Sequence, residues 1–510
     1  MSALNELQNY TFVSKYARWI ESENRRETWR EAVDRVKDMM HTQYQNQNVD
    51  EEIDWAYDLM FKKKVLGSQR ALQFGGDPIL KRHAKIYNCT SSYCDRLRFF
   101  QECFWLLLCG SGTGFSVQKH HVAKLPNLST HKKDKRKGVK YKIEDSIEGW
   151  ADSLGVLLSS YFNKPSDPKF TQYKDQYIVF DYGNIREKGA QLSSGVGKAP
   201  GFEPLQNGLE KIRELLDRCV ADGQKKLRPI DAYDIIMHSS DAVLSGGVRR
   251  SASLALFSCD DQEMAKAKTG NWYVDNPQRA RSNNSALLLK DDTTYDQFAT
   301  LMESVKEFGE PGFIWSDSTE MTFNPCVEVG MWPVDEQSGK SGWQGCNLST
   351  INCSSIADEE DFYERCKAAA VIGTLQAGFT DLEYLGNTSK AIFDREALLG
   401  VSLTGIMERH ELVLTEKVLK KGAKIAVDTN KELAKKISIN QAARVTCLKP
   451  EGTSSSMLGT SSGIHPHHAK RYIRHVQANI LEAPYQHFKS YNPQACEKSS
   501  WSANDTDEVV

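Results

Sequence analysis

The sequence predicts an α/β fold, and three observations support this prediction. From residue 205 onward, helical patterns at 209–222 and 232–244 alternate with short apolar stretches at 253–257 and 285–289. Alternation of this kind is typical of α/β architectures. Hydrophobic residues make up 40% of the chain and charged residues 26%, as in ordinary globular proteins. With 510 residues, the chain is long enough for one large domain or two to three smaller ones.

The N-terminal part is expected to be helical. Within 10–65, an apolar stripe begins at Tyr16 and Trp19 and continues through Val33, with charged residues between its members. A further apolar helix is expected over 101–108. It should end at the glycine cluster in 110–116, because glycine interrupts helices.

Residues 125–200 form a polar stretch with Lys-rich, Pro-containing and Gly-containing loops. One helix at 147–162 and one strand at 177–180 are expected within it. We expect this stretch to be an insertion or an exposed regulatory region rather than part of the core. The basic run at 131–137 is interpreted as a solvated loop, the usual place for a short run of charge.

Charge and cysteine content limit the function classes. The formal net charge of -2 does not favour binding to nucleic acid or to a membrane surface. The longest apolar run, at 104–109, is far too short to span a bilayer. No signal peptide is visible at the N-terminus, so we expect a cytoplasmic protein whose twelve cysteines are mostly reduced. Because no Cys-x-x-Cys occurs, a structural zinc site is not expected.

The most chemically specific segment is Asn324-Pro325-Cys326-Val327-Glu328. Pro325 excludes a regular helix, and in an extended strand or tight loop alternate side chains point the same way. Asn324, Cys326 and Glu328 would then face one ligand with an amide, a thiol and a carboxylate. The other interpretation is a buried cysteine in a loop.

Two further cysteines could complete such a site. Cys89 follows Asn88, and Cys346 follows Gly345, twenty residues after the Cys326 segment. If the fold brings them together, they could form a dithiol that is oxidised to a disulfide while a substrate near Cys326 is reduced. The spacing alone does not establish this.

Four segments could bind anions or metal ions, and each has a plainer interpretation. Residues 110–116 are glycine-rich but lack the Lys-Ser/Thr ending of a P-loop. Residues 449–456 could present donors to a phosphate, or simply form a helix N-cap. Residues 246–251 could sense a nucleotide through two arginines, or form a glycine C-cap with solvated charges. The histidines of 465–468 are too crowded around Pro466 for ready metal binding.

Together these motifs resemble the catalytic subunit of ribonucleotide reductase, most closely the adenosylcobalamin-dependent (class II) ribonucleoside-triphosphate reductases. The resemblance runs along almost the whole chain. The matching segments are Tyr16 to Trp19 with Arg25-Arg26-Glu27, Asn88-Cys89, 110–116, 246–251, Arg281-Ser282-Asn283-Asn284-Ser285, Gly309-Glu310-Pro311-Gly312, 324–328, Cys346-Asn347-Leu348 and 449–455.

The resemblance implies a ten-stranded α/β barrel with a central finger loop and N-terminal helices. In these terms, 1–85 is the N-terminal helical region and 86–510 the barrel, with an effector-binding or insertion region at about 120–205 and the finger loop at about 322–332. The chain ends at Val510, where members of the family continue. We therefore expect it to lack the last barrel strands and a C-terminal cysteine pair, as a fragment or one half of a split gene.

The resemblance also implies roles for the reactive residues. Cys326 is similar to the cysteine whose thiyl radical removes the 3′-hydrogen of the ribose. Glu328 resembles the base that takes the 3′-hydroxyl proton, and Asn324 the amide that holds the substrate. Cys89 and Cys346 resemble the redox-active pair that helps to expel the 2′-hydroxyl and becomes a disulfide.

The remaining assignments come from the same resemblance. The cofactor would be adenosylcobalamin, with no metal other than its cobalt, and the partners a deoxynucleotide effector, a thioredoxin-like reductant and possibly a second polypeptide that supplies the missing part. The implied contacts are Lys449, Pro450, Gly452, Thr453, Ser454, Ser455 and Gly112 for the substrate, Gly247, Arg249, Arg250 and Ser251 for the effector signal, and Gly114, Phe115 and Ser116 for the cofactor.

The sequence is also compatible with two other functions. One is a class I large subunit, which receives its radical from a separate protein. The other is an inactive nucleotide-binding fragment. The expected reaction is the reduction of ribonucleotides, with triphosphates as the expected substrates, to 2′-deoxyribonucleotides for DNA synthesis.

Overall fold

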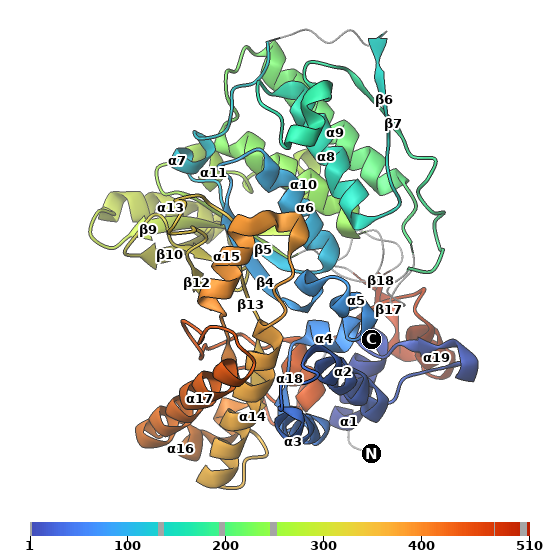
Figure 1. The fold of residues 1–510 in the computed structure, drawn as a ribbon, viewed down its shortest axis with the longest axis vertical. Helices are drawn as coiled ribbons and strands as arrows, with labels where there is room; N and C mark the ends of the chain where they lie inside the picture. Colours follow the sequence, from blue (N-terminus) through green and yellow to red (C-terminus); the bar gives the residue numbers. More distant parts are fainter. Residues whose placement is uncertain (1–2, 131–136, 193–198, 245–251, 474, 500–506) are drawn as a thin grey trace.

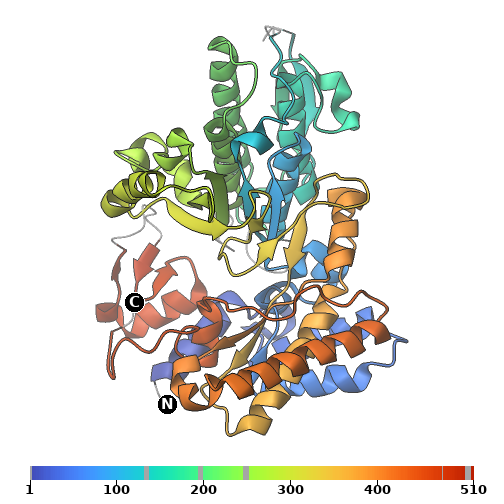
Figure 2. The same cartoon turned by 90° about the vertical axis from the view of Figure 1, so that its left-hand side faces the viewer.

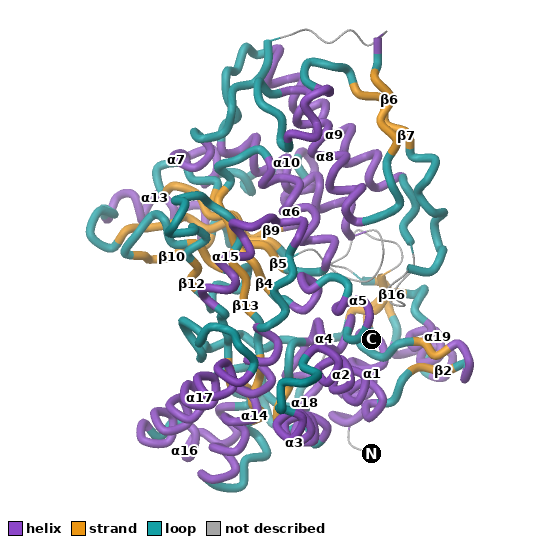
Figure 3. Tube along the Cα trace, viewed as in Figure 1, coloured by secondary structure: helices purple, strands orange, loops and turns teal. Residues whose placement is uncertain are grey.

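A computed structural model describes residues 3–130, 137–192, 199–244, 252–473, 475–499 and 507–510. Strands gather in the middle of the molecule, with helices packed around them (Figure 3). The C-terminal segment lies near the N-terminal helix α1 (Ala3–Lys15) (Figures 1 and 2). Among the described helices, none has both the length and the apolar character needed to cross a membrane.

The larger sheet has six strands in the order β10-β9-β8-β5-β4-β13. Five of them are parallel, and β13 alone runs antiparallel, against β4. Their bounds are Cys89–Tyr93 (β4), Gly112–Ser116 (β5), Ser253–Ser258 (β8), Ser282–Leu289 (β9), Gly312–Ser316 (β10) and Gln344–Cys346 (β13). The strands expected near 253–257 and 285–289 are therefore present.

Four helices pack on one another beside this sheet, in the upper part of Figure 1. They are α6 (Arg98–Cys109), α8 (Ile147–Tyr161), α9 (Glu203–Ala221) and α10 (Pro229–Leu244). Each lies where the sequence predicts a helix. Nearly every side chain of α8 is buried, so the expectation that 125–200 lies outside the core is wrong for this helix. Its apolar residues are needed to cover α6, with which it packs.

A smaller sheet has the strand order β15-β14-β3. Helices α14 and α3 pack against it, and α17 packs on α14. Helix α14 contacts all three strands and also lies against α3 and α17 (Figure 1). The bounds are Val65–Leu66 (β3), Ser349–Asn352 (β14), Val401–Thr404 (β15), Asp50–Phe61 (α3), Glu359–Ala377 (α14) and Glu416–Lys436 (α17). Through its pairing with β14, strand β3 places N-terminal residues in the same sheet as residues 349–352.

Two short strands, β11 (Thr322–Phe323) and β12 (Gly330–Met331), form an antiparallel hairpin. The hairpin lies against β4 and β5 of the larger sheet. Its six-residue loop holds the segment that the sequence singles out, so we call residues 322–331 the finger hairpin.

The other described elements are shorter or lie at the periphery. They are β1 (Trp19–Ile20), β2 (Arg25–Arg26), α2 (Trp29–Gln43), α4 (Gln69–Phe74), α5 (Asp77–Leu80), α7 (Lys119–Val122), β6 (Val139–Lys142), β7 (Ile178–Asp181), α11 (Gln262–Ala265), α12 (Trp272–Asp275), α13 (Tyr295–Phe308), α15 (Gly386–Glu396), α16 (His410–Val413), α18 (Thr453–Leu458), β16 (Gln477–Asn479), α19 (Ala483–Tyr491), β17 (Glu497–Lys498) and β18 (Asp507–Val509).

The mixed α/β class is confirmed by these elements. A ten-stranded barrel and the domain limits stay predictions, because the described strands form separate sheets rather than one closed ring. The basic run at 131–137 and the loop at 246–251 lie wholly or almost wholly outside the described residues.

Candidate active site

The finger hairpin lies so close to strand β5 that only glycine fits beneath it. A Cβ atom on Gly114 would be 1.7 Å from the backbone oxygen of Phe323, far inside van der Waals contact. Gly112, two residues earlier on the same face of β5, lies under Pro325, whose Cγ would be 3.1 Å from an added Cβ. The glycines of 110–116 therefore allow a close approach of two backbones.

The tip of the hairpin is a turn rather than an extended strand. Val327 N–H donates to the Asn324 carbonyl at 2.9 Å, and Val327 has a φ of +67°. A β-branched residue rarely adopts this left-handed conformation, and such strain is concentrated at functional sites. The extended alternative is thus wrong for Asn324 to Glu328. In the turn, Cys326 is exposed and Asn324 is buried.

Asn324 and Glu328 contact each other across this turn. Asn324 Nδ2 donates to Glu328 Oε2 at 2.6 Å, and Asn324 Oδ1 accepts from the backbone of Val329 at 3.0 Å. The other carboxylate oxygen, Glu328 Oε1, is buried and has no hydrogen-bond partner among the described residues. A buried carboxylate oxygen without a partner is costly, so this atom is suited to a hydroxyl group of a bound ligand.

Cys89 and Cys346 are direct partners across two neighbouring strands. Cys89 of β4 is in register with Cys346 of β13 and, on its other side, with Gly112 of β5. Both thiols are buried, in a small apolar cluster that also contains Val329 and Met331 of the finger hairpin. The fold therefore brings the two cysteines together beneath the hairpin, as the dithiol hypothesis requires.

The two thiols differ in acidity. A hydrogen bond from the Cys346 thiol lowers the pKa of Cys89, and Asn324 adds a second hydrogen bond, although burial and the Glu328 carboxylate act in the opposite sense. The pKa of Cys346 is raised well above its usual range, because Cys89 accepts its proton and because it is buried. Cys89 is therefore the more acidic thiol of the pair, and Cys346 donates the hydrogen bond between them.

Lys449 brings a half-buried positive charge to the same site. Burial lowers its pKa, but the nearby Glu451, Cys89 and Glu328 outweigh burial and raise the pKa above its ordinary value. The Lys449 backbone N–H donates to Ser402 Oγ at 3.0 Å, which fixes the segment beside β15. The ammonium group thus lies within electrostatic reach of the thiol and carboxylate groups.

The other residues expected to contact substrate lie around the start of α18. Gly452 precedes the helix, and a Cβ atom there would meet no atom within 4 Å. Ser454 and Thr350 donate hydrogen bonds to the buried Glu451 carboxylate, while Ser455 donates to backbone carbonyls. Pro450 accepts from Ser462, and Thr453 opens the helix. Their role in holding phosphate stays a prediction.

Sequence reasoning missed a fourth cysteine at this site. Cys447 packs on the cluster that contains Cys89 and Cys346. Burial raises its pKa to about 12, and Glu328 adds to the shift. A signal was present, since Cys447 precedes Lys449 by two residues, and alternate residues of an extended segment share a face. The segment is extended, because Cys447 N–H donates to the carbonyl of Val401 in β15.

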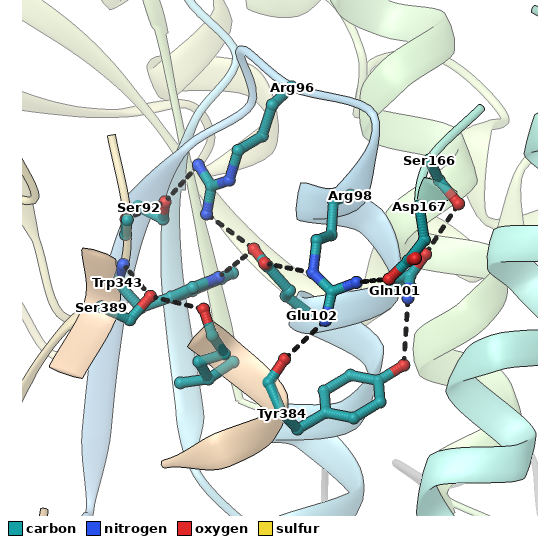
Figure 4. A network of polar contacts seen from close by, with 12 residues as sticks. Ser92, Arg96, Arg98, Gln101, Glu102, Ser166, Asp167, Trp343, Tyr384 and Ser389 are labelled. Carbon is teal, nitrogen blue, oxygen red and sulfur yellow. Dashed lines mark hydrogen bonds and ion pairs between the residues drawn. The ribbon is translucent and has the colours of Figure 1, made fainter. Parts of the chain in front are cut away.

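A polar network fixes the approach of the chain to Cys346 (Figure 4). Trp343, three residues before Cys346, donates from its indole nitrogen to Glu102 at 2.9 Å. Glu102 is almost fully buried and also accepts from Arg96 at 2.7 Å and Arg98 at 3.1 Å. Trp343 in addition stacks on Phe99 of α6 at 5.3 Å. Helix α6 therefore positions the strand that carries one of the two buried thiols.

Comparison with known proteins bears on these observations. No family model matches the chain. A probable adenosylcobalamin-dependent ribonucleoside-triphosphate reductase of Dictyostelium discoideum is 29% identical over 66% of this chain and 43% of its own length. The adenosylcobalamin-dependent ribonucleoside-triphosphate reductase of Lactobacillus delbrueckii is 24% identical over 92% of this chain and 74% of its own length.

Solved structures share the fold. A crystal structure of a B12-dependent (class II) ribonucleotide reductase superposes with a TM-score of 0.79 at 21% identity, covering 100% of this chain and 83% of that one. The class Id ribonucleotide reductase alpha subunit of Actinobacillus ureae gives a TM-score of 0.51 at 11% identity, over 91% of this chain and 75% of that one. In sequence and fold, the chain is similar to class II ribonucleotide reductases. The recognition made from the sequence motifs is therefore confirmed.

The residues expected to contact the cofactor are buried. Gly114 lies beneath the hairpin, Phe115 packs on Phe99, and Ser116 bonds to His121 and Gln118. Their contact with a cofactor stays a prediction. Of the effector loop, Gly247, Arg249, Arg250 and Ser251 lie outside the described residues. In the crowded histidine segment, His467 pairs with Glu408 at 3.4 Å.

Proposed function

We propose that this chain reduces ribonucleotides, with ribonucleoside triphosphates as the expected substrates, to 2′-deoxyribonucleotides by a cysteine radical mechanism. One observation supports the proposal: the hairpin that carries Cys326 and the unpartnered Glu328 oxygen packs through Val329 and Met331 on the cluster of the Cys89 and Cys346 thiols. The matched segments span 43% of one relative and 74% of another, so the activity of the whole relatives is inferred for this chain.

The role of Cys326 follows from its exposure at the tip. The carbon–hydrogen bond at C3′ of a ribose is too strong for acid–base chemistry alone, so a cofactor must supply a radical. Adenosylcobalamin, when bound, supplies that radical chemistry. Cys326 fits this role because its side chain is exposed at the turn, where a bulky cofactor can reach it. Cys326 then exchanges a hydrogen atom with C3′.

Glu328 and Asn324 act on the 3′-hydroxyl group. Glu328 Oε1, which has no partner in the described protein, accepts the proton of the 3′-hydroxyl as a general base. Asn324 Nδ2 holds the other oxygen at 2.6 Å and fixes the direction of the carboxylate. The base is therefore oriented before the substrate arrives.

Cys89 and Cys346 supply the electrons. Replacing the 2′-hydroxyl by hydrogen consumes two electrons and two protons and releases one water. Oxidation of two thiols to one disulfide provides both. Because the hydrogen bond from Cys346 lowers the pKa of Cys89, Cys89 is the stronger acid of the pair, and we assign the proton transfer to the leaving 2′-hydroxyl to Cys89, with Cys346 as its neighbouring proton donor.

The partners follow from the same chemistry. A thioredoxin-like dithiol would return the Cys89–Cys346 disulfide to the reduced state, and a second polypeptide would supply any part that turnover requires. We place the reaction in the cytoplasm, where a dithiol stays reduced. Lys449 and the start of α18 would bind the triphosphate, and a deoxynucleotide effector would act through residues 246–251.

The test is an assay of the reduced chain with adenosylcobalamin, CTP, a deoxynucleotide effector and a dithiol, read as dCTP by chromatography. We expect cofactor-dependent dCTP, no dCTP from Cys326→Ser, and unchanged CTP binding by that variant. The matched control is Cys259→Ser, which changes a partly exposed cysteine just after β8 and should keep full activity. Activity retained by Cys326→Ser, or product formed without the cofactor, would contradict the proposal.

A further inference from the structure

A second cluster of reactive side chains lies at the opposite end of the central strands from the thiols. His120 and His121 belong to α7, just after β5, and Glu320 lies two residues before the finger hairpin. Cys89 begins β4 and Tyr93 ends it, a separation of about 13 Å along a strand. Tyr93 contacts His121, so this cluster is separate from the candidate active site.

The two imidazole rings converge on one carboxylate. His120 Nε2 lies 2.7 Å from Glu320 Oε1, and His121 Nε2 lies 3.2 Å from Glu320 Oε2. One ligand atom from each residue falls within 4.8 Å of the others. In a tetrahedral zinc site with bonds of about 2.0–2.1 Å, neighbouring ligand atoms are about 3.3 Å apart. The cluster therefore needs only small side-chain shifts to take a metal ion.

The orientation of His121 is fixed from both sides. Its Nδ1 bonds to Ser116 Oγ at 2.8 Å, so Nε2 is the nitrogen that points to Glu320. Tyr93 stacks on the ring at 4.0 Å with an interplanar angle of 14°. In metal sites, a hydrogen bond to the second ring nitrogen similarly sets the direction of the ligating one. His121 is fully buried, whereas His120 and Glu320 are partly exposed and leave an opening to solvent.

Within the described part of the chain, neither lysine nor arginine pairs with the Glu320 carboxylate. Among the described residues, its recorded ion-pair partners are the two histidines alone. Thr319 Oγ1 adds a long contact to this carboxylate, at 3.5 Å. A divalent cation bound by all three side chains would balance the carboxylate charge.

We propose that His120, His121 and Glu320 form a binding site for a divalent transition-metal ion, with zinc as the expected occupant. Imidazole and carboxylate ligands suit zinc, and three protein ligands leave the fourth position to a water molecule at the open side. Such an ion would join α7 to the root of the finger hairpin. It would therefore hold the hairpin that carries Cys326 against β5, without touching the reacting groups.

The test is a titration of the metal-free full chain with Co²⁺ alone, followed by competition with Zn²⁺. We expect about one Co²⁺ per chain, visible d–d bands of a tetrahedral site, and no sulfur-to-cobalt charge-transfer band, because the ligands are nitrogen and oxygen. Zn²⁺ should displace the Co²⁺ and raise the melting temperature of the chain. Sulfur charge transfer, or no binding, would overturn the proposal.

Variants separate this site from other histidines. His120→Ala and Glu320→Gln change partly exposed side chains, so both should fold, which circular dichroism checks. Each should weaken Co²⁺ binding at least about tenfold. A triple change of His465, His467 and His468 to Ala removes the competing histidine segment and should leave binding unchanged. Binding that survives His120→Ala, or that is lost in the triple variant, would place the metal elsewhere.

Discussion

At the tip of the finger hairpin, the two oxygens of Glu328 have different surroundings. Asn324 holds one oxygen, and the other is buried without a partner among the described residues. Glu328→Gln keeps the shape and an oxygen for Asn324 but removes the base. We expect the rate of dCTP formation to fall about 10²- to 10⁴-fold with little change in CTP binding.

Steady-state rates and equilibrium CTP binding check this expectation. Glu336→Gln changes an exposed carboxylate five residues after the hairpin and serves as the control. A Glu328→Gln variant within threefold of the unchanged chain would show that another group takes the 3′-hydroxyl proton. A loss of CTP binding equal to the loss of rate would instead give Glu328 a binding role.

The thiol pair makes a prediction about pH. The Cys346 thiol donates to Cys89 and lowers the pKa of Cys89. Removing that donor in Cys346→Ala should raise this pKa, so the thiolate of Cys89 should form only at higher pH. The rate of alkylation follows the thiolate fraction, which grows as the pH rises through the pKa. The midpoint of the rate–pH curve should therefore shift to higher pH in Cys346→Ala.

Peptide-level mass spectrometry after timed iodoacetamide treatment measures this midpoint for Cys89 separately from the other cysteines. Cys447→Ser, which changes a neighbouring thiol that does not donate to Cys89, should leave the midpoint in place. A midpoint that stays fixed in Cys346→Ala would mean that the two sulfurs do not share a proton.

At the scale of elements, the close passage of the hairpin over β5 depends on Gly114. The added methyl group of Gly114→Ala would collide with the Phe323 backbone oxygen, and neither backbone can move away without breaking the strand pairing. We expect a loss of about 1–3 kcal/mol in the free energy of unfolding and a larger loss of activity, because the displaced hairpin carries Cys326.

Urea unfolding and the dCTP assay measure the two effects. Gly373→Ala in α14 is the matched control, since its added Cβ would make ordinary contacts with Leu399 and alanine favours helix. The control should be at least as stable as the unchanged chain. Full activity in Gly114→Ala would show that the hairpin does not need its present position.

Helices and central strands could be predicted from the sequence because their apolar patterns are local. Helix α8, expected at 147–162, runs from Ile147 to Tyr161, and β8 lies within one residue of its expected range. The turn at Val327 could not be predicted, because valine disfavours a positive φ and only the surrounding contacts impose it. The hairpin strands have two residues each, too few for a pattern.

The site itself was predictable in its residue types and not in its contacts. Cys89 and Cys346 meet through the register of β4 with β13, which joins residues far apart in sequence. The position of Cys447 beside them, and the meeting of His121 with Glu320, depend on the same long-range packing. The sequence linked Cys89 with Cys346 as a possible dithiol, and the family resemblance supported that pairing. It linked neither Cys447 to this pair nor His121 to Glu320.

At the scale of the whole molecule, one segment joins the two sheets. Strand β13 ends at Cys346 in the larger sheet, and β14 begins at Ser349 in the smaller one, with Asn347 and Leu348 between them. Asn347 bonds to Leu398 and Gln376, which fixes this crossing. The Cys89 and Cys346 pair therefore lies where the two sheets meet. We expect it to change from dithiol to disulfide with each turnover.

This arrangement predicts the yield of a single round of reaction. One dithiol holds two electrons, so a reduced chain freed of external reductant should form about one dCTP per chain and then stop. Added dithiol should restart the reaction.

Mass spectrometry should find a disulfide between the Cys89 and Cys346 peptides in an amount equal to the product. Cys447→Ser should give the same yield, because this thiol lies beside the pair without being part of it. A yield of two or more per chain would show that a further pair of thiols feeds the site, and product without the Cys89–Cys346 disulfide would remove these two cysteines from the reduction step.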